Sequence, residues 1–366
     1  MNRKGKRIFL LGIAVLFLAA GCGKKQQTKT ELALVTDGQS TSSAVFESLQ
    51  SGMEKYSQKE GKKSAVYIPE ARSEEGYEKA IEQAVEKGAE VVVCAGDSMS
   101  RAVYEAQREN RNVRFLFLDG VPENEKGEQY IRGNTECIRI ATAEAGYLAG
   151  YAAVASGYQK LGFLGGSSTV TREYGTGFAL GADQAAADLE LEKDSITLEY
   201  CFRKKNDASP EFLDQLISWY QEGGQILFTD GNAFQNVVAA AAEQTGGAVL
   251  WNGGSPDSSS ALLQVRLEYG NVVNDALSDM EKDQFEGGKI VYTGVKEKNI
   301  TLDWNRDKLP AFTEAQYQKA CGKLTGEDFE MPDNDALQQP EECGIARIRI
   351  SSLELRRTSA QETPAK

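Results

Sequence analysis

The 366-residue sequence predicts an α/β protein with two lobes, each built on a doubly wound parallel sheet. Short apolar runs alternate with amphipathic helical patterns, as expected when helices cover both faces of a sheet. The runs form two series with nearly the same step, starting near residues 32, 65, 91 and 114 and near 161, 196, 226 and 248. Hydrophobic residues make up 41% of the chain, which is enough for two cores.

The first series begins with the apolar strand Leu32–Thr36 (LALVT), and the following helix carries an apolar stripe that includes Phe46. Further strands are expected at 65–68, 91–95 and 114–118, with helical patterns between them. A stripe of small residues then runs through 134–155. It predicts a helix that packs close to a sheet, and we expect the first crossing into the second lobe there.

The second series opens with the stretch 161–187, which has the pattern of a strand, a glycine-rich turn and a helix facing a pocket. The apolar strand ends at Gly165 and Gly166, which allow a turn with exposed backbone N–H groups. Arg172 and Tyr174 follow, and they offer a planar donor fork and an aromatic face to a small polar ligand. An ordinary turn with a surface arginine is an equally good interpretation of this pattern.

The later strands are expected at 196–200, 226–229 and 248–251. After a loop rich in turn formers, the pattern at 262–265 and a helix over 269–280 predict a return to the first lobe. A final crossing is expected over 289–303, followed by a closing helix at 313–321. The predicted domains are a signal peptide 1–21, a lipidated tether 22–31, lobe one 32–136 plus about 255–288, lobe two 137–254 plus about 289–354, and a disordered tail 355–366.

The N-terminus has the features of an export signal. Four basic residues fall within the first seven positions, and 8–20 is apolar without a charge, which is too short for a permanent membrane helix. Small residues precede Cys22 in the segment LAAGC, which resembles a bacterial lipobox, so we expect Cys22 to be lipidated. Lys24, Lys25 and Lys29 would add attraction to anionic headgroups. The predicted location is the extracytoplasmic side of the cell membrane, with the protein held by a lipid anchor.

Charge and cysteine usage argue against a nucleic-acid-binding protein and against a fold held by a disulfide framework. Without residues 1–21 the chain has 37 basic and 54 acidic residues, a formal net charge of −17, which argues against a nucleic-acid partner. The five cysteines beyond Cys22 are odd in number and scattered, so they do not form a disulfide framework. Whether Cys321 and Cys343 pair is left open.

The chain contains no histidine, which removes the commonest general base, the usual nucleophile pairs and the imidazole metal ligands. It also lacks the phosphate loop, the nucleophile elbow and the dinucleotide fingerprint. We therefore expect a binding protein and not an enzyme, without a cofactor or a metal. A glycosidase that uses only carboxylates remains an alternative, because 54 acidic residues bring some pairs together by chance.

Polar side chains recur just beyond the carboxyl ends of the predicted strands, where open α/β sheets bind ligands. Carboxylates and amides there can accept hydrogen bonds from sugar hydroxyls, and aromatic rings nearby can stack on a ligand ring. Each polar residue could equally cap the next helix. The polar candidates are Asp37, Asp119, Asp230, Asn232 and Asn252, and the aromatic ones are Phe46, Tyr174 and Trp251.

These pieces resemble the basic membrane lipoprotein family, the PnrA-like nucleoside-binding proteins of ABC transporters. The lipobox, LVTDG at 34–38, AGDSMSRAVYEAQRENRNVRFLFLD at 95–119, EAGYLAGYAAV at 144–154 and LGFLGG at 161–166 match in order and spacing. The resemblance covers most of the mature chain and implies a type I periplasmic-binding-protein fold with a hinge of about three strands. It also implies a ligand-contact role for Asp119 and, more loosely, for Asp37.

The sequence departs from the family at three places. Ser42-Ser43-Ala44-Val45-Phe46 replaces an Asp-x-Ser-Phe-Asn segment, Trp251-Asn252-Gly253-Gly254 replaces a strand that ends in Gly-Val-Asp, and the Lys of a later Ser-x-x-Lys segment is missing. The resemblance thus implies a lipid-anchored solute-binding protein that delivers a nucleoside or related sugar-containing molecule to ABC permease subunits. A sensor or regulatory lipoprotein of the same fold is the alternative.

Overall fold

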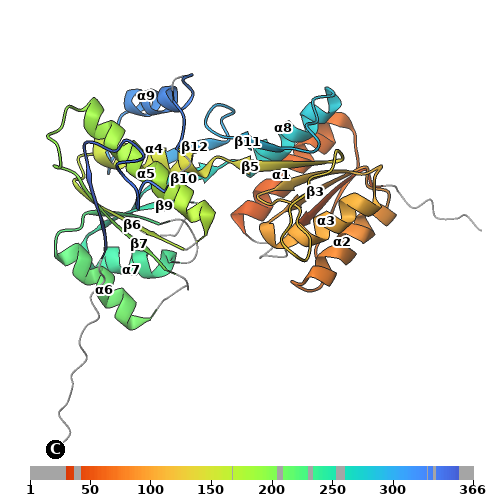
Figure 1. Ribbon diagram of the computed structural model, residues 1–366, viewed down its shortest axis with the longest axis horizontal. Helices are drawn as coiled ribbons and strands as arrows, with labels where there is room; N and C mark the ends of the chain where they lie inside the picture. The colour runs from red at the N-terminus through yellow and green to blue at the C-terminus, as the bar shows by residue number, and fades with distance from the viewer. Residues whose placement is uncertain are drawn as a thin grey trace, which may run out of the picture.

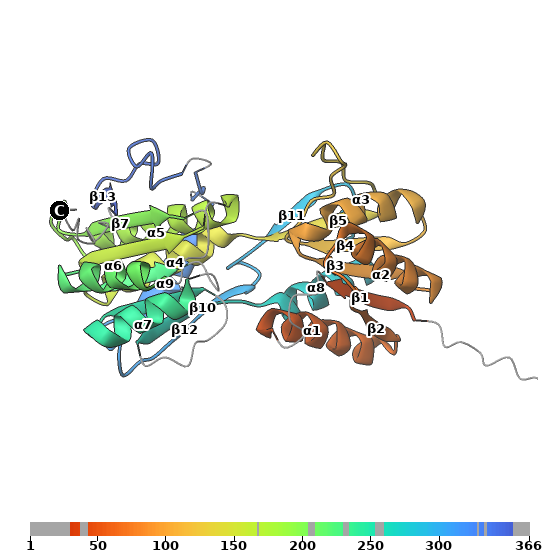
Figure 2. The ribbon, with the colours of Figure 1, turned by 90° about the horizontal axis from the view of Figure 1, so that it is seen from below.

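The computed structural model describes residues 30–36, 43–166, 168–203, 209–229, 234–252, 260–327, 329–332 and 335–353. It shows two α/β lobes side by side, joined by chain segments that cross between them (Figures 1 and 2). The predicted fold class is confirmed. The predicted signal peptide, residues 22–29 of the tether and the predicted tail lie outside the described residues. None of the described helices is long and apolar enough to span a membrane.

Lobe one is built on a six-stranded parallel sheet with the order β11-β5-β4-β3-β1-β2. Its strands are β1 (Leu32–Thr36), β2 (Ser64–Tyr67), β3 (Val91–Ala95), β4 (Arg114–Leu118), β5 (Thr135–Ile140) and β11 (Ile290–Thr293). Successive side chains pack on opposite faces, so that Leu34 packs with α1 (Ala44–Glu60) and α8 (Tyr269–Glu281), whereas Val35 packs with α2 (Glu74–Glu86) and α3 (Ser100–Glu109). Both faces are covered, which explains the continuous apolar runs.

Lobe two contains a seven-stranded sheet with the order β12-β10-β9-β8-β6-β7-β13, in which β12 alone runs antiparallel among the described strands. Its strands are β6 (Lys160–Gly165), β7 (Thr197–Phe202), β8 (Ile226–Thr229), β9 (Ala248–Asn252), β10 (Ala261–Leu267), β12 (Ile300–Trp304) and β13 (Arg349–Ser352). One core contains α4 (Thr142–Ala155), α5 (Thr169–Asp188) and α9 (Glu314–Leu324), and the opposite core contains α6 (Pro210–Gln221) and α7 (Gln235–Thr245).

The lobe boundaries differ from the predicted ones at three places. The expected boundary at 136–137 cuts through β5, which pairs with β4 and belongs entirely to lobe one. β10 pairs with β9 and β12, so the chain returns to lobe one after Leu267 and not near 255. β11 pairs with β5, so lobe one extends to Thr293 and not to 288. An apolar run has the same local pattern in either sheet, and only its distant pairing partner decides which lobe it joins.

Three crossings among the described segments connect the lobes: β5 to α4, β10 to α8 and β11 to β12. They agree with the predicted hinge of about three strands. The third crossing contains a turn held from two sides, because the N–H of Gly294 donates to Glu297 Oε2 (3.0 Å) and that of Val295 donates to Glu144 Oε2 (2.7 Å). Glu144 lies in the first turn of α4, so it links the first crossing to the third.

Helices α4 and α5 pack backbone against backbone. A Cβ atom added at Gly177 would lie 1.8 Å from the carbonyl oxygen of Ala143, and one at Gly181 would lie 1.9 Å from that of Tyr147. The small-residue stripe predicted for close packing is present in α4, but its nearest partner is another helix and not the sheet itself.

The described cysteines are free thiols, including Cys321 and Cys343, whose pairing the sequence left open. Cys94 is buried within β3, and burial raises the pKa of its thiol. The C-terminal segment adds β13 to the edge of the second sheet. Asp183 Oδ1 on α5 accepts hydrogen bonds from three consecutive backbone N–H groups, at residues 346, 347 and 348 (2.6–3.1 Å).

Candidate ligand-binding site

Asp119 lies directly after β4 with a left-handed backbone (φ 54°). This conformation is uncommon for a residue with a side chain, and aspartate tolerates it better than most. Its N–H still donates to the carbonyl oxygen of Ile138 on β5 (3.0 Å). The backbone thus leaves the sheet at Asp119 while the residue remains fixed to the neighbouring strand, beside the first crossing.

The carboxylate of Asp119 accepts a hydrogen bond from a residue 150 positions away. Tyr269 donates its hydroxyl to Asp119 Oδ2 at 2.6 Å. Tyr269 is the first residue of α8, immediately after the second crossing. The bond therefore joins the end of a lobe-one strand to the point where the chain re-enters lobe one.

Burial raises the pKa of the Asp119 carboxyl above its ordinary value of 3.8. The Tyr269 hydroxyl, the backbone of Ile140 and the charge of Arg139 act in the opposite direction, while the carboxylate of Asp97 adds to the rise. Burial and the nearby carboxylate raise the pKa of Tyr269 well above its usual value, so Tyr269 stays a neutral donor. Asp119 is thus an ionisable hydrogen-bond acceptor, and Tyr269 is the neutral donor that holds it in place.

Asp119 predicts opposite pH dependences for stability and for ligand binding. Folding raises the pKa of Asp119. Between about pH 4 and this raised pKa, the folded protein therefore carries a proton on Asp119, whereas the unfolded chain does not. The stability contribution of Asp119 therefore falls as the pH rises through this window. Affinity for a hydroxyl donor rises over the same window, because the carboxylate ionises. Melting curves across this pH window measure the stability, and calorimetric titrations measure the affinity. Asp119→Asn should make both quantities less dependent on pH. If both pH dependences are unchanged in that variant, Asp119 is not the group that causes them.

The structure brings a second predicted residue, Tyr174, to this place. Tyr174 lies on α5 with 3% of its surface exposed, edge-on to Phe228 at a ring-centroid distance of 6.2 Å. It is close enough to Tyr269 to influence the pKa of that hydroxyl. Tyr269 therefore donates to Asp119 of lobe one and lies in the neighbourhood of Tyr174 of lobe two.

Phe46 lies in the first turn of α1, where its N–H donates to Ser43 Oγ (3.1 Å). Phe46 is 8% exposed, and it belongs to a large hydrophobic core that extends over both lobes and also contains Tyr174. Asn252 ends β9 and is 8% exposed. Asp37, Asp230 and Asn232 lie outside the described residues.

Two other candidates have different surroundings from those expected. Arg172 forms an ion pair with Asp335 (2.6 Å), and its guanidinium lies 4.7 Å from the ring centroid of Phe202, so both interactions hold it within lobe two. Trp251 was expected to offer a stacking face, and this is wrong in the structure. It is 1% exposed and packs in the core formed with α6 and α7, because strand residues alternate between the two faces of the sheet.

Sequence reasoning missed Tyr269. The sequence predicts Tyr269 at the start of a helix in lobe one, as the structure has it, but does not single it out as a ligand residue. The same rule that selected Asp119 could have selected it, because Tyr269 also follows closely after a strand, β10, at the crossing between the lobes.

The chain is similar to known proteins over most of its length. The family model Bmp, described as ABC transporter substrate-binding protein PnrA-like, matches residues 29–327. The chain belongs to this family. A Bmp relative, the ABC transporter nucleoside-binding protein BmpA of Lactococcus lactis subsp. cremoris, is 23% identical over 337 residues, which cover 82% of this chain and 92% of BmpA. Basic membrane protein A of Borreliella burgdorferi is 21% identical over 338 residues, which cover 89% of this chain and 95% of that protein.

Solved structures show the same fold. An ABC transporter solute-binding protein from Conexibacter woesei aligns with a TM-score of 0.63 at 16% identity, over 83% of this chain and 99% of that one. A transcriptional activator of the comK gene from Bacillus halodurans aligns with a TM-score of 0.64 at 13% identity, over 82% and 99%. At these identities the likeness concerns the fold alone. The family resemblance and the fold class expected from the sequence are both confirmed, and the Bmp family is one of substrate-binding proteins.

Proposed function

We propose that this Bmp protein is a lipid-anchored, extracytoplasmic solute-binding protein of an ABC importer, without enzymatic activity, that binds a nucleoside or a related sugar-containing molecule between its lobes. The observation that carries the proposal is the Asp119–Tyr269 pair, which places a carboxylate acceptor at the strand end beside two crossings. The Lactococcus lactis relative, named as nucleoside-binding, supports the choice of ligand class.

The chemistry of Asp119 fits a ligand with neighbouring hydroxyl groups. An ionised carboxylate can accept two hydrogen bonds from a ribose-like diol, and charge-assisted bonds are stronger than neutral ones. Tyr269 already donates a hydrogen bond to Asp119 Oδ2. Because this donor is neutral, an ionised Asp119 keeps its negative charge. Phe46 and Tyr174 are the aromatic residues that we propose for contact with a ring, one from each lobe, although both are buried here, so ligand entry would have to expose them.

A thermal-shift screen of residues 28–366 against nucleosides, free bases, pentoses and hexoses tests the proposal. A ligand present at 100 times its Kd adds about 2.7 kcal/mol to the free energy of unfolding, so a specific ligand is easily detected. We expect nucleosides to raise the melting temperature and to be recovered unchanged. A shift with free sugars alone would reject the nucleoside, and turnover of a nucleoside or glycoside would reject the binding-protein assignment.

Ligand binding should make the molecule more compact. The lobes are joined by three described crossings, and a ligand that contacts Asp119 on one lobe and Tyr174 on the other stabilises a closed arrangement. Small-angle scattering with saturating ligand measures the change as a smaller radius of gyration. The same measurement with a sugar that gives no thermal shift is the control, and an unchanged radius with the true ligand contradicts hinge closure.

Cys22→Ala should release the protein from the membrane. A lipobox cysteine carries the acyl chains, and more than one chain is required for stable anchoring, so loss of this side chain removes the anchor completely. Fractionation of a Gram-positive host that expresses each form measures the effect, and globomycin should block maturation of the wild type only. Cys94→Ala, which alters a cysteine buried in β3, should leave the protein membrane-bound. A wild type found in the soluble fraction would contradict the anchor.

A further inference from the structure

The described segment 335–353 is attached to lobe two along α5 and β7. It lies beyond residues 29–327, which are the ones that the family model matches. Its strand β13 pairs with β7 at the edge of the sheet. Near its other end, Ala336 is buried, and the N–H of Ala336 donates to Thr176 Oγ1 on α5 (3.1 Å). We call this segment the C-terminal strap, and it is a part of lobe two that the family match does not include.

The start of the C-terminal strap fits against the second turn of α5. A Cβ atom added at Gly175 would lie 2.4 Å from Cδ1 of Leu337, so α5 has no side chain at the place where Leu337 packs. Asp335 then orders the backbone that follows it. Its Oδ1 accepts the N–H of Leu337 (3.1 Å), and its carbonyl oxygen accepts those of Gln338 (3.1 Å) and Gln339 (2.9 Å). These bonds fix the orientation of the Asp335 carboxylate.

The second oxygen of that carboxylate pairs with Arg172. Asp335 Oδ2 lies 2.6 Å from Arg172 Nη1, and the Asp335 side chain is 13% exposed, against 36% for Arg172. The guanidinium also lies 4.7 Å from the ring centroid of Phe202, the last residue of β7. Arg172 is therefore held at the carboxyl edge of the lobe-two sheet by one partner from the C-terminal strap and one from the sheet itself.

This edge of lobe two is also the one that carries the candidate ligand site. Arg172 lies in the first turn of α5, which follows the carboxyl end of β6, and Tyr174 is two residues further along the same helix. Tyr174 in turn lies in the neighbourhood of Tyr269, the partner of Asp119. An arginine at such an edge is suited to a phosphate or carboxylate group, which it can bind through two parallel N–H donors. Pairing with Asp335 satisfies that preference within the chain.

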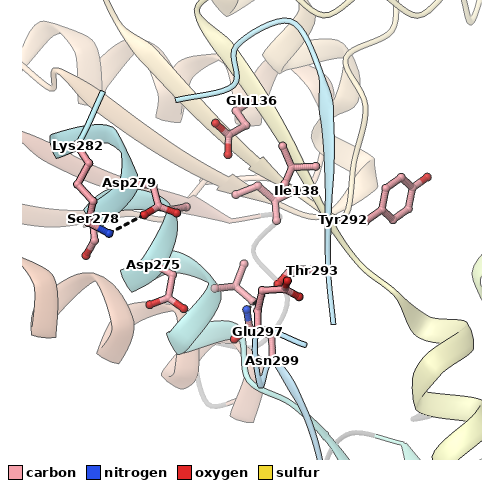
Figure 3. A pocket seen from close by; sticks show the side chains of 13 residues that line it. Glu136, Ile138, Asp275, Ser278, Asp279, Lys282, Tyr292, Thr293, Glu297 and Asn299 are labelled. Carbon is pink, nitrogen blue, oxygen red and sulfur yellow. Dashed lines mark hydrogen bonds and ion pairs between the residues drawn. The ribbon is translucent and has the colours of Figure 1, made fainter. Parts of the chain in front are cut away.

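The charge beside the hinge also acts against an anionic ligand. A hollow of about 380 Å³ lies on lobe one, where α8 faces β5, β11 and the third crossing (Figure 3). Four carboxylates line it, and Lys282, the basic residue in its lining, is paired with Asp279 (2.9 Å). This lining adds negative potential next to the third crossing, and an anion bound between the lobes has to overcome it.

We propose that Asp335 is a specificity-determining residue, which matches the charge of Arg172 and thereby restricts the ligand site to uncharged molecules. Discrimination of this kind comes from removing an attraction for the wrong ligand, and it needs no additional contact to the right one. The inference rests on the proposed solute-binding function and adds to it the charge of the ligand. Without the negative charge of Asp335, the guanidinium of Arg172 is free to donate to the phosphate group of a nucleotide.

Asp335→Asn tests the proposal with little change to the C-terminal strap. The amide oxygen still accepts the N–H of Leu337, while the amide nitrogen takes the place of the oxygen that faces Arg172. The probes are adenosine, guanosine, cytidine and uridine and their 5′-monophosphates, titrated by calorimetry at about 0.15 M NaCl, where charges beyond about 8 Å are screened. We expect at least one monophosphate to bind Asp335→Asn at least tenfold more tightly than it binds the wild type.

Two further variants separate the pair from general charge effects. Asp183→Asn is the matched control, because Asp183 also holds the C-terminal strap and the net charge changes equally, but it lies about three turns further along α5 than Arg172. It should bind monophosphates like the wild type. Arg172→Gln/Asp335→Asn should lose the gain, because the guanidinium is absent. Melting curves of all four proteins check that each is folded.

Three outcomes would overturn the proposal. Equal monophosphate affinities of the wild type and Asp335→Asn would mean that Asp335 does not exclude anions. An equal gain in Asp183→Asn would mean that net charge alone is responsible. A gain that persists in Arg172→Gln/Asp335→Asn would assign the new contact to another residue. The nucleoside affinities of the wild type are measured separately and report on the proposed function, so the failure of one proposal is distinguished from the failure of the other.

Discussion

Asp119→Ala is expected to weaken ligand binding at least tenfold. The substitution removes a charged acceptor that is fixed by a left-handed backbone and by the hydroxyl of Tyr269, and a hydrogen bond to a charged group contributes about 1.5–3 kcal/mol. A loss of 1.4 kcal/mol corresponds to a factor of ten in the dissociation constant. It also leaves Tyr269 without its acceptor, so Asp119→Asn, which keeps an oxygen in reach of Tyr269, separates loss of charge from loss of the contact.

Isothermal titration with the nucleoside that gives the largest thermal shift measures the effect. Asp188→Asn is a matched control, because Asp188 also accepts a hydrogen bond from a tyrosine, Tyr151 (2.9 Å), but at the C-terminal end of α5 in lobe two, where it is paired with Lys319. This variant should bind the ligand normally even if it is less stable. Equal affinities for wild type and Asp119→Ala, or equal losses in the two variants, would contradict the role of Asp119.

Much of the fold could be predicted because local patterns determine it. The strands at 32–36, 91–95, 114–118 and 226–229 were placed at the residues where they occur, since each is a continuous apolar run bounded by turn formers or helical patterns. The positions of β5, β10 and β11 in the two sheets could not be predicted in the same way. These strands adjoin the crossings, and their assignment depends on partners more than a hundred residues away or on the far side of a loop.

The candidate site was partly predictable for a similar reason. The rule that ligands bind beyond the carboxyl ends of parallel strands identifies Asp119 from sequence alone. Trp251 satisfied the same rule, but β9 continues through Asn252 and directs the indole into the core on the other face of the sheet. The contact between Tyr269 and Asp119 is a tertiary contact between the start of α8 and the end of β4, and no local periodicity encodes it.

Gly177→Ala should destabilise lobe two, although alanine is the better helix former. In an isolated helix the change would be favourable by about 0.8–1 kcal/mol. In α5 the new methyl group would lie 1.8 Å from the carbonyl oxygen of Ala143 and 2.8 Å from the backbone nitrogen of Tyr147, and neither atom can rotate away. The two helices must therefore separate along their contact. Overpacking of this kind costs about 1–3 kcal/mol, and the rigid neighbours place Gly177 at the upper end.

Gly322→Ala makes the same chemical change in α9, where an added Cβ atom meets nothing within 4 Å. It should therefore stabilise the protein by roughly 0.5–1 kcal/mol, so the two variants are expected to move the melting temperature in opposite directions. Adding Gly181→Ala to Gly177→Ala should deepen the loss, because that methyl group would lie 1.9 Å from the carbonyl oxygen of Tyr147. Melting curves decide the matter: if Gly177→Ala raises the melting temperature as Gly322→Ala does, α4 and α5 are not in backbone contact. The outcome also bears on the ligand site, since Tyr174 lies less than one turn from Gly177 on the helix that would have to move.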